Sequence, residues 1–136
     1  MHPAPEQLVD SPLFASLTDE QLRAVASLMD VVTQPAGTTL VGEGAPGFSV
    51  FVLLDGAAEA TAEDLPLSTL RAGDYFGEIA LLNEARRTAT VTATSPVTLA
   101  VMYGSDFRVF ERDFPNAAQQ MKETTARRLE RSGSPE

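Results

Sequence analysis

The 136-residue sequence contains no cysteine and only one histidine. The absence of cysteine excludes disulfide bonds, thiolate metal sites and cysteine nucleophiles. The single histidine, His2, lies next to the N-terminus, where serine–histidine catalysis and histidine-ligated metals are not expected. The sequence therefore predicts a protein that is not an enzyme and that carries no metal or resident cofactor.

Positive charge is also scarce, because 10 Lys and Arg residues face 19 Asp and Glu residues and the formal net charge is −9. Such a chain is not expected to bind nucleic acid directly, so any anion that it binds must be held by locally placed groups. No segment approaches the roughly 18 apolar residues of a membrane span. The N-terminus lacks the basic and apolar regions of a secretion signal. We therefore expect a cytoplasmic protein without a membrane span.

The length and composition are typical of one globular domain, with 43% hydrophobic and 21% charged residues. Residues 1–12 contain three prolines and few large apolar side chains, which predicts a flexible leader. Residues 13–131 are expected to form the folded domain. The polar residues 132–136 are expected to form a flexible tail.

Helical patterns occur at both ends of this domain. Thr18 and Gln21 form a capping box, flanked by Leu17 and Leu22 in the positions of a hydrophobic staple, and this predicts a helix over residues 19–29. After residue 102 the helical period returns. Two further helices are predicted there, the first capped by Ser105 and running to about residue 112, the second over about 116–131.

Between the helical ends, short β-prone runs alternate with turns rich in Gly, Pro and Asp. This pattern predicts a mainly β fold, an antiparallel jelly-roll barrel with flanking helices and one short helical turn over residues 77–82. Four aromatic residues are interpreted as core: Phe51, Tyr75, Phe76 and Phe107. The expected strands are 38–41, 50–54, 57–62, 67–70, 88–93 and 97–102.

The segment with the clearest chemistry is residues 76–91, which read FGEIALLNEARRTATV. Gly77 permits a close backbone approach, and the first amides of the short turn that follows can hold an anion. Arg87 can fold back over this turn and bind the same anion bidentately, while the Glu78 carboxylate can accept hydrogen bonds from a hydroxyl. A neighbouring anion and hydroxyl describe a ribose phosphate. An internal Glu78–Arg87 ion pair is the equally weighted alternative from spacing alone.

The segment resembles the phosphate-binding cassette of cyclic nucleotide-binding domains, the module of bacterial catabolite activators, cyclic nucleotide-dependent kinases and cyclic nucleotide-gated channels. The resemblance extends to the glycines in 42–47, the strand before Asp55-Gly56, the lead-in 70–74 and the flanking helices. It covers about residues 13–131. It implies a regulatory domain that binds cAMP or cGMP and signals through its C-terminal helices to an effector protein that the sequence does not identify.

The resemblance also implies roles for individual residues. Glu78 would hold the ribose 2′-hydroxyl, and Arg87 would neutralise the cyclic phosphate. In some members of the family, a hydroxyl residue at the position of Thr88 favours cGMP by contacting the guanine amino group. Bacterial cAMP receptors also often carry Ser or Thr at this position. We expect cAMP to be the ligand. Backbone amides would line the phosphate and sugar at Gly77, Ile79, Ala80 and Thr88. Candidates for the lid over the base are Met121, Thr124, Thr125 and Arg128.

Two positions depart from the family pattern. Arg86 stands where proline is common, and Phe48 replaces a small or acidic residue. Glu43 is interpreted either as a support for Arg87 or as a solvated turn residue. The rival functional hypothesis is a degenerate domain that keeps the fold and binds a protein instead of a nucleotide. An enzyme with a cupin-type jelly roll is poorly supported, because the chain lacks histidine or clustered carboxylate ligands.

Overall fold

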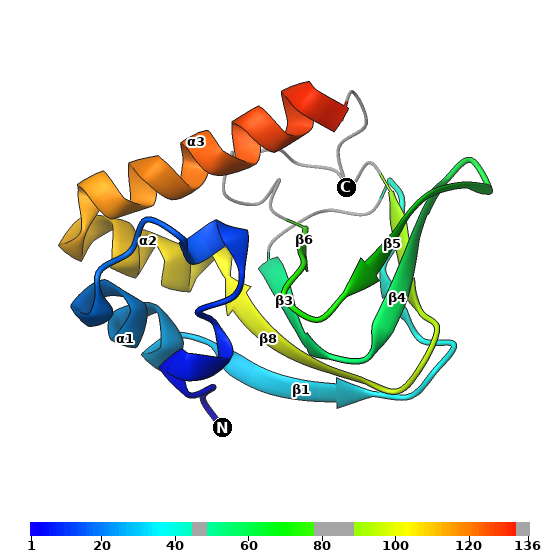
Figure 1. Ribbon diagram of the computed structural model, residues 1–136, viewed down its shortest axis with the longest axis horizontal. Helices are drawn as coiled ribbons and strands as arrows, with labels where there is room; N and C mark the ends of the chain where they lie inside the picture. Colours follow the sequence, from blue (N-terminus) through cyan, green and yellow to red (C-terminus); the bar gives the residue numbers. More distant parts are fainter. Residues whose placement is uncertain (45–48, 78–88, 133–136) are drawn as a thin grey trace.

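The computed structural model describes residues 1–44, 49–77 and 89–132, and these residues form two antiparallel sheets with a layer of helices (Figure 1). Sheet A has the order β1-β8-β3-β6 and sheet B the order β2-β7-β4-β5. The mainly antiparallel β class is confirmed. The strands form two four-stranded sheets rather than a single closed barrel. The strands of sheet A are β1 (Asp30–Gln34), β8 (Val97–Tyr103), β3 (Ser49–Asp55) and β6 (Tyr75–Phe76). Those of sheet B are β2 (Thr39–Val41), β7 (Thr90–Ala93), β4 (Ala57–Ala62) and β5 (Leu65–Arg71).

Two of these strands were not predicted. β1 follows helix α1 (Asp19–Ser27) after only Leu28 and Met29, without the Gly or Pro break that marks the other strands. β6 has two residues, too few to show an alternating pattern. Both become strands through pairing, β1 with β8 and β6 with β3, so tertiary contacts rather than local sequence define them.

Helix α1 (Asp19–Ser27) confirms the predicted capping box. The Gln21 amide donates to Thr18 Oγ1 at 3.2 Å, and the Thr18 amide donates to Gln21 Oε1 at 2.9 Å. Leu17 and Leu22 are half-buried and pack against the same apolar cluster, as a hydrophobic staple requires. The helix ends two residues before the predicted Met29, which is itself fully buried.

Helices α2 (Gly104–Asp113) and α3 (Pro115–Ser132) form the C-terminal pair. The prediction that Ser105 caps α2 is wrong, because the N-cap is Tyr103 and Ser105 lies inside the helix. Phe114 leaves the helical conformation, with φ −135° and ψ 68°, and ends α2. Pro115 then starts α3, a position where its fixed φ and missing N–H are tolerated.

The N-terminal residues 1–12, expected to be a flexible leader, pack onto the domain. They contain the 3-10 turn η1 (Pro5–Gln7), and a second turn, η2 (Pro12–Phe14), follows. Leu8 is fully buried in the core, and the Val31 amide donates to the Met1 carbonyl at 2.8 Å. One buried leucine anchors the segment, a feature that its proline-rich composition conceals.

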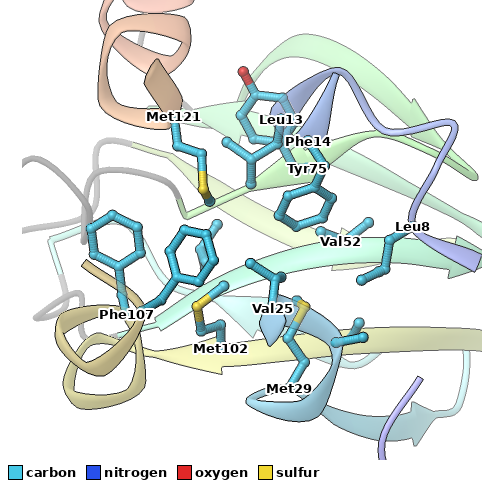
Figure 2. Close-up of a cluster of buried hydrophobic side chains, with 14 of the residues drawn as sticks. Leu8, Leu13, Phe14, Val25, Met29, Val52, Tyr75, Met102, Phe107 and Met121 are labelled. Carbon is cyan, nitrogen blue, oxygen red and sulfur yellow. The ribbon is translucent and has the colours of Figure 1, made fainter. Parts of the chain in front are cut away.

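The two faces of sheet A border different apolar clusters. The helical cluster lies between sheet A and the helices, and Figure 2 shows side chains from several elements meeting there, including Met29, Met102, Phe107 and Met121. The inter-sheet cluster lies between sheets A and B and includes Leu53, Phe76 and Leu99. Because sheet A is covered on both faces, β8 is almost continuously buried, which matches its uninterrupted apolar run.

Candidate functional site

The candidate nucleotide-binding segment connects the two sheets. It leaves sheet A at the end of the edge strand β6 and enters sheet B at the beginning of β7. Gly77 is the predicted site residue that the structure describes. The other predicted site residues lie outside the described residues: Glu78, Ile79, Ala80, Arg87 and Thr88. Most of the short helical turn predicted over residues 77–82 also lies outside them. The described residues therefore define how both ends of the segment are held.

Gly77 has φ +73° and is buried. This left-handed conformation is costly for residues with a Cβ and is readily adopted by glycine. The sequence predicts that Gly77 permits a close backbone approach. The structure adds that the position demands a backbone conformation that glycine supplies.

Aromatic packing fixes the chain just before Gly77. Tyr75 and Phe76 are buried, and the Phe76 ring stacks on Phe51 with centroids 5.0 Å apart and an interplanar angle of 9°. Phe51 pairs with Phe76, and Val52 with Tyr75, in the β3–β6 ladder. The prediction that these aromatics are core residues is confirmed for Tyr75, Phe76 and Phe107, while Phe51 is half-buried beside them.

The turn before β6 is also held by hydrogen bonds. The Leu53 amide donates to the Asp74 carbonyl, and the Gly73 amide donates to the Leu53 carbonyl, each at 2.8 Å. The Asp74 carboxylate accepts a hydrogen bond from the Arg71 amide at 2.8 Å. The lead-in to Gly77 is thus tied to β3 by backbone pairs as well as by ring packing.

On the downstream side, Ala89 and Val91 are buried, and Val91 and Ala93 belong to the inter-sheet cluster. Strand β7 pairs with β2 on one side and β4 on the other. Thr90, the first residue of β7, is half-buried, and its Oγ1 accepts a hydrogen bond from the Glu43 amide at 3.0 Å. The chain therefore enters sheet B at an interior strand with a side-chain contact at its first residue.

Glu43 makes a second contact that neither interpretation of it included. Its side chain is exposed, and its Oε1 accepts a hydrogen bond from the Glu63 amide at 3.0 Å. Glu43 is therefore exposed, as the solvated interpretation expects, yet bonded to the turn between β4 and β5. Its predicted alternative partner, Arg87, lies outside the described residues.

The proposed lid residues on α3 differ in exposure. Met121 and Thr125 are fully buried, and Met121 belongs to the helical cluster. The Thr125 hydroxyl donates to the Lys122 carbonyl at 2.8 Å. Thr124 is half-buried, and its hydroxyl donates to the Gln120 carbonyl at 3.0 Å. The side chain of Arg128 lies outside the described residues.

Within 1–44, 49–77 and 89–132, no group of three or more His, Cys, Asp or Glu side chains could hold a metal ion. In that part of the chain, no helix has both the length and the apolar character needed to cross a membrane.

Two solved structures with a similar fold are from bacteria. The N-terminal domain of a transcriptional regulator from Streptomyces coelicolor A3(2) has a TM-score of 0.79 at 30% identity, covering 93% of this chain and 92% of that one. The catabolite activator protein of Thermus thermophilus has a TM-score of 0.81 at 26% identity, covering 90% of this chain and 60% of that one. These likenesses extend over nearly the whole chain.

Sequence comparison points to the same group of proteins. A cAMP-dependent protein kinase regulatory subunit of Aspergillus fumigatus is 38% identical over 103 residues, which are 74% of this chain and 25% of that protein. The chain thus spans about a quarter of that relative's length. The family model described as "Cyclic nucleotide-binding domain" matches residues 31–113, which is more than half of the chain. On this match, the chain belongs to the cyclic nucleotide-binding domain family.

Proposed function

We propose that this chain binds a cyclic nucleotide, cAMP or cGMP, through residues 77–88 and acts as a regulatory domain without catalytic activity of its own. The observation that carries the proposal is the extent of the family match. It runs from residue 31 to residue 113 and so contains the whole predicted cassette. The residue types that the chemistry needs, a glutamate and an arginine nine positions apart after a glycine, are present as Glu78, Arg87 and Gly77.

Each residue has a defined role in the proposed site. The Arg87 guanidinium neutralises the cyclic phosphate with a bidentate, charge-assisted contact. The amides of Gly77, Ile79, Ala80 and Thr88 donate to the phosphate and sugar oxygens. The Glu78 carboxylate accepts a hydrogen bond from the ribose 2′-hydroxyl. The protein's overall charge of −9 repels an anion, so affinity depends on these local donors.

The described framework supports this site because it anchors both ends of the segment. Gly77 follows a strand tied to β3 by ring stacking and hydrogen bonds, and Thr90 begins an interior strand of sheet B. A binding group that is held by rigid neighbouring elements loses less entropy when the ligand is captured. Such anchoring suits a site that must place several donors around one phosphate.

The proposed ligand is cAMP in preference to cGMP. The relative from Aspergillus fumigatus is named as the regulatory subunit of a cAMP-dependent protein kinase, which favours the same base here by likeness. Thr88 is the one predicted residue that can contact a guanine amino group, and it makes cGMP the second candidate.

Signal transmission is proposed to run through α2 and α3. These helices pack on the face of sheet A opposite to the inter-sheet cluster, with Phe107, Phe110 and Met121 buried among them. Ligand capture would repack this layer and change the surface that an effector protein contacts. A ligand shifts such an equilibrium only by the difference in its affinity for the two arrangements.

The deciding measurement is isothermal titration of the purified chain with cAMP and, separately, with cGMP. We expect saturable heat with one site per chain and tighter binding of cAMP. A folded chain that gives no heat with either nucleotide at hundreds of micromolar would reject the proposal. That outcome, joined by recovery of a protein partner, would instead indicate a degenerate domain that binds a protein.

A further inference from the structure

A groove lies between helix α1 and the N-terminal turn η1. Figure 1 shows these two elements side by side at the outer edge of the helical layer. The groove has a volume of about 310 Å³, at the lower end of the range for binding pockets. Three residues from each wall line it: Pro5, Glu6, Val9, Asp19, Leu22 and Arg23. A groove of this size can receive a side chain from another molecule.

The apolar part of the groove is only partly covered. Leu22 is half-buried and packs against the helical cluster. Val9 is 59% exposed, although its neighbour Leu8 is fully buried. Pro5 is half-buried. Contact with a partner would remove this small apolar surface from water, which favours association.

The same groove carries charges of both signs. Glu6, Asp19 and Arg23 are all exposed. Asp19 and Arg23 are four positions apart on α1, a spacing at which two side chains can pair on one helix. Within the part of the chain that the structure describes, the ion pairs join other residues, and Arg23 pairs with neither carboxylate. An acidic and a basic group are therefore free to meet a partner about one helical turn apart.

This arrangement of charges is complementary to itself. Two copies of α1 can face each other in antiparallel orientation across a two-fold axis near Leu22. Asp19 of each copy then lies opposite Arg23 of the other, so the same ion pair forms twice. The exposed apolar side chains of the two grooves meet between these pairs. A groove with charge of a single sign would instead bring like charges together and exclude a second copy.

We propose that this groove is the contact between two copies of the chain, which form a symmetric dimer through η1 and α1. The exposed apolar surface is small, and the net charge of −9 on each copy opposes their approach. Interfaces below about 1,200 Å² belong to weak or transient complexes, so we expect dissociation constants of about 0.1–1 mM. None of the six groove residues belongs to the proposed nucleotide site, so the dimer does not depend on nucleotide binding.

The test is sedimentation equilibrium of the full chain at concentrations up to about 1 mM. We expect the average mass to rise from that of one chain, 14.5 kDa, toward twice that value. Arg23→Glu and Asp19→Arg each put like charges in contact and should each raise the dissociation constant at least about 10-fold. The two substitutions change the net charge by two units in opposite directions. General charge repulsion would therefore weaken the dimer of Arg23→Glu and strengthen that of Asp19→Arg.

Mixing the two variants provides the sharpest comparison. The Arg23→Glu chain is acidic at both positions and the Asp19→Arg chain is basic at both, so a mixed dimer regains both opposite-charge pairs. We expect the equimolar mixture to dimerise within about 3-fold of the unaltered chain. Rescue by mixing also shows that both variants are folded.

Matched controls carry the same charge changes outside the groove. Glu20→Arg alters the same first turn of α1, and Arg108→Glu alters an exposed residue of α2. Neither residue lines the groove, so each control should change the dissociation constant by less than about 3-fold.

Three results would overturn the proposal. A single-chain mass at every concentration would reject it and would leave the groove to a different protein. A dimer that is unaffected by Arg23→Glu and Asp19→Arg would form through another surface. A dimer that both substitutions weaken but their mixture does not restore would lack the reciprocal ion pairs.

Discussion

Lys122, the only lysine of the chain, joins α3 to α2 through a 2.5 Å contact between its Nζ and Glu111 Oε2. The same Nζ lies 5.9 Å from the centroid of the Phe107 ring on α2. The side chains of Lys122 and Glu111 are 25% and 38% exposed, so water screens the pair only in part. This one side chain thus combines an ion pair and a cation–π contact between the two helices proposed to transmit the signal.

Replacing Lys122 by methionine should loosen the helix pair while keeping the aliphatic packing. A partly exposed ion pair stabilises by about 0.2–1 kcal/mol, and the ring contact adds about 0.5–1 kcal/mol. We expect Lys122→Met to lower the free energy of unfolding by about 1 kcal/mol, measured by urea denaturation. A double-mutant cycle with Glu111→Gln should give a coupling energy of a few tenths of a kcal/mol or more. Strictly additive effects would show that the pair does not couple the helices.

Substitution of Gly56, which lies between β3 and β4, should destabilise the fold more than substitution of Gly37, which precedes β2. Its φ is +94°, and a Cβ built on it would lie 2.3 Å from the Pro96 carbonyl oxygen and 2.9 Å from Ser95 Oγ. Gly37 is the matched control, because its φ is +90° and a Cβ there would meet nothing within 4 Å.

Alanine at Gly37 should therefore cost only the backbone term of roughly 1–2 kcal/mol. Alanine at Gly56 should cost that amount plus the displacement of the residue 95–96 turn, about 3 kcal/mol or more in all. The Ala57 amide, which donates to Ser95 Oγ at 2.9 Å, would lose its partner as the turn shifts. Equal unfolding free energies for the two variants would contradict the steric argument.

Ser11 carries a buried hydroxyl that has no hydrogen-bond partner among the described residues. The residue is 2% exposed, and its Oγ is the buried atom that lacks a hydrogen-bond partner. Burying an unpaired hydroxyl costs about 1–3 kcal/mol, so Ser11→Ala should raise the free energy of unfolding by about 1 kcal/mol. Ser27→Ala is the control: that exposed hydroxyl donates to the Ala24 carbonyl at 2.7 Å, and its removal should change stability by less than about 0.5 kcal/mol. A destabilised Ser11→Ala would show that the hydroxyl is satisfied in solution.

The sequence predicted those parts of the fold that depend on local signals. Thr18 and Gln21 sit three positions apart and bond to each other, so the start of α1 is readable from four consecutive residues. The β-prone run 97–102 predicted the strand that the structure has as β8. The turn at Gly56 was also predictable from the sequence, because glycine is the residue type that readily adopts the positive φ found there.

Two of the contacts that the sequence did not predict are long-range. Leu8 is one apolar residue in a proline-rich segment, and it is buried because it packs into the apolar cluster between the helices and sheet A. Glu43 reaches partners 20 and 47 residues away, and no spacing rule relates such positions. The candidate site itself was predicted by its motif. The structure contributes the anchoring on either side of that motif, at Gly77 and Thr90.

Thr88 provides a test of base selection. If its hydroxyl contacts the guanine amino group, Thr88→Ala should weaken cGMP binding by about 3- to 10-fold, the effect of losing one hydrogen bond. Affinity for cAMP, which lacks that amino group, should change by less than about 2-fold. The two nucleotides are compared by titration of the same protein preparations. Equal losses for cAMP and cGMP would place Thr88 against the phosphate or sugar instead of the base.

The proposed role of Arg87 can be separated from a general effect of positive charge, because Arg86 stands next to it in the sequence. Arg87→Glu should abolish nucleotide binding, since it replaces the phosphate's counter-charge with a carboxylate. Arg86→Glu changes the net charge by the same amount and should weaken binding only through long-range repulsion, an effect that disappears at high salt. Removing a charge-assisted contact costs about 1.5–3 kcal/mol, or roughly 10- to 150-fold in affinity, so Arg87→Ala should lose at least about 10-fold at any salt concentration. Glu78→Ala should weaken binding less and leave the circular dichroism spectrum unchanged. If the Arg86 and Arg87 variants lose affinity equally and recover it equally at high salt, the bound phosphate is attracted by the local field and not gripped by Arg87.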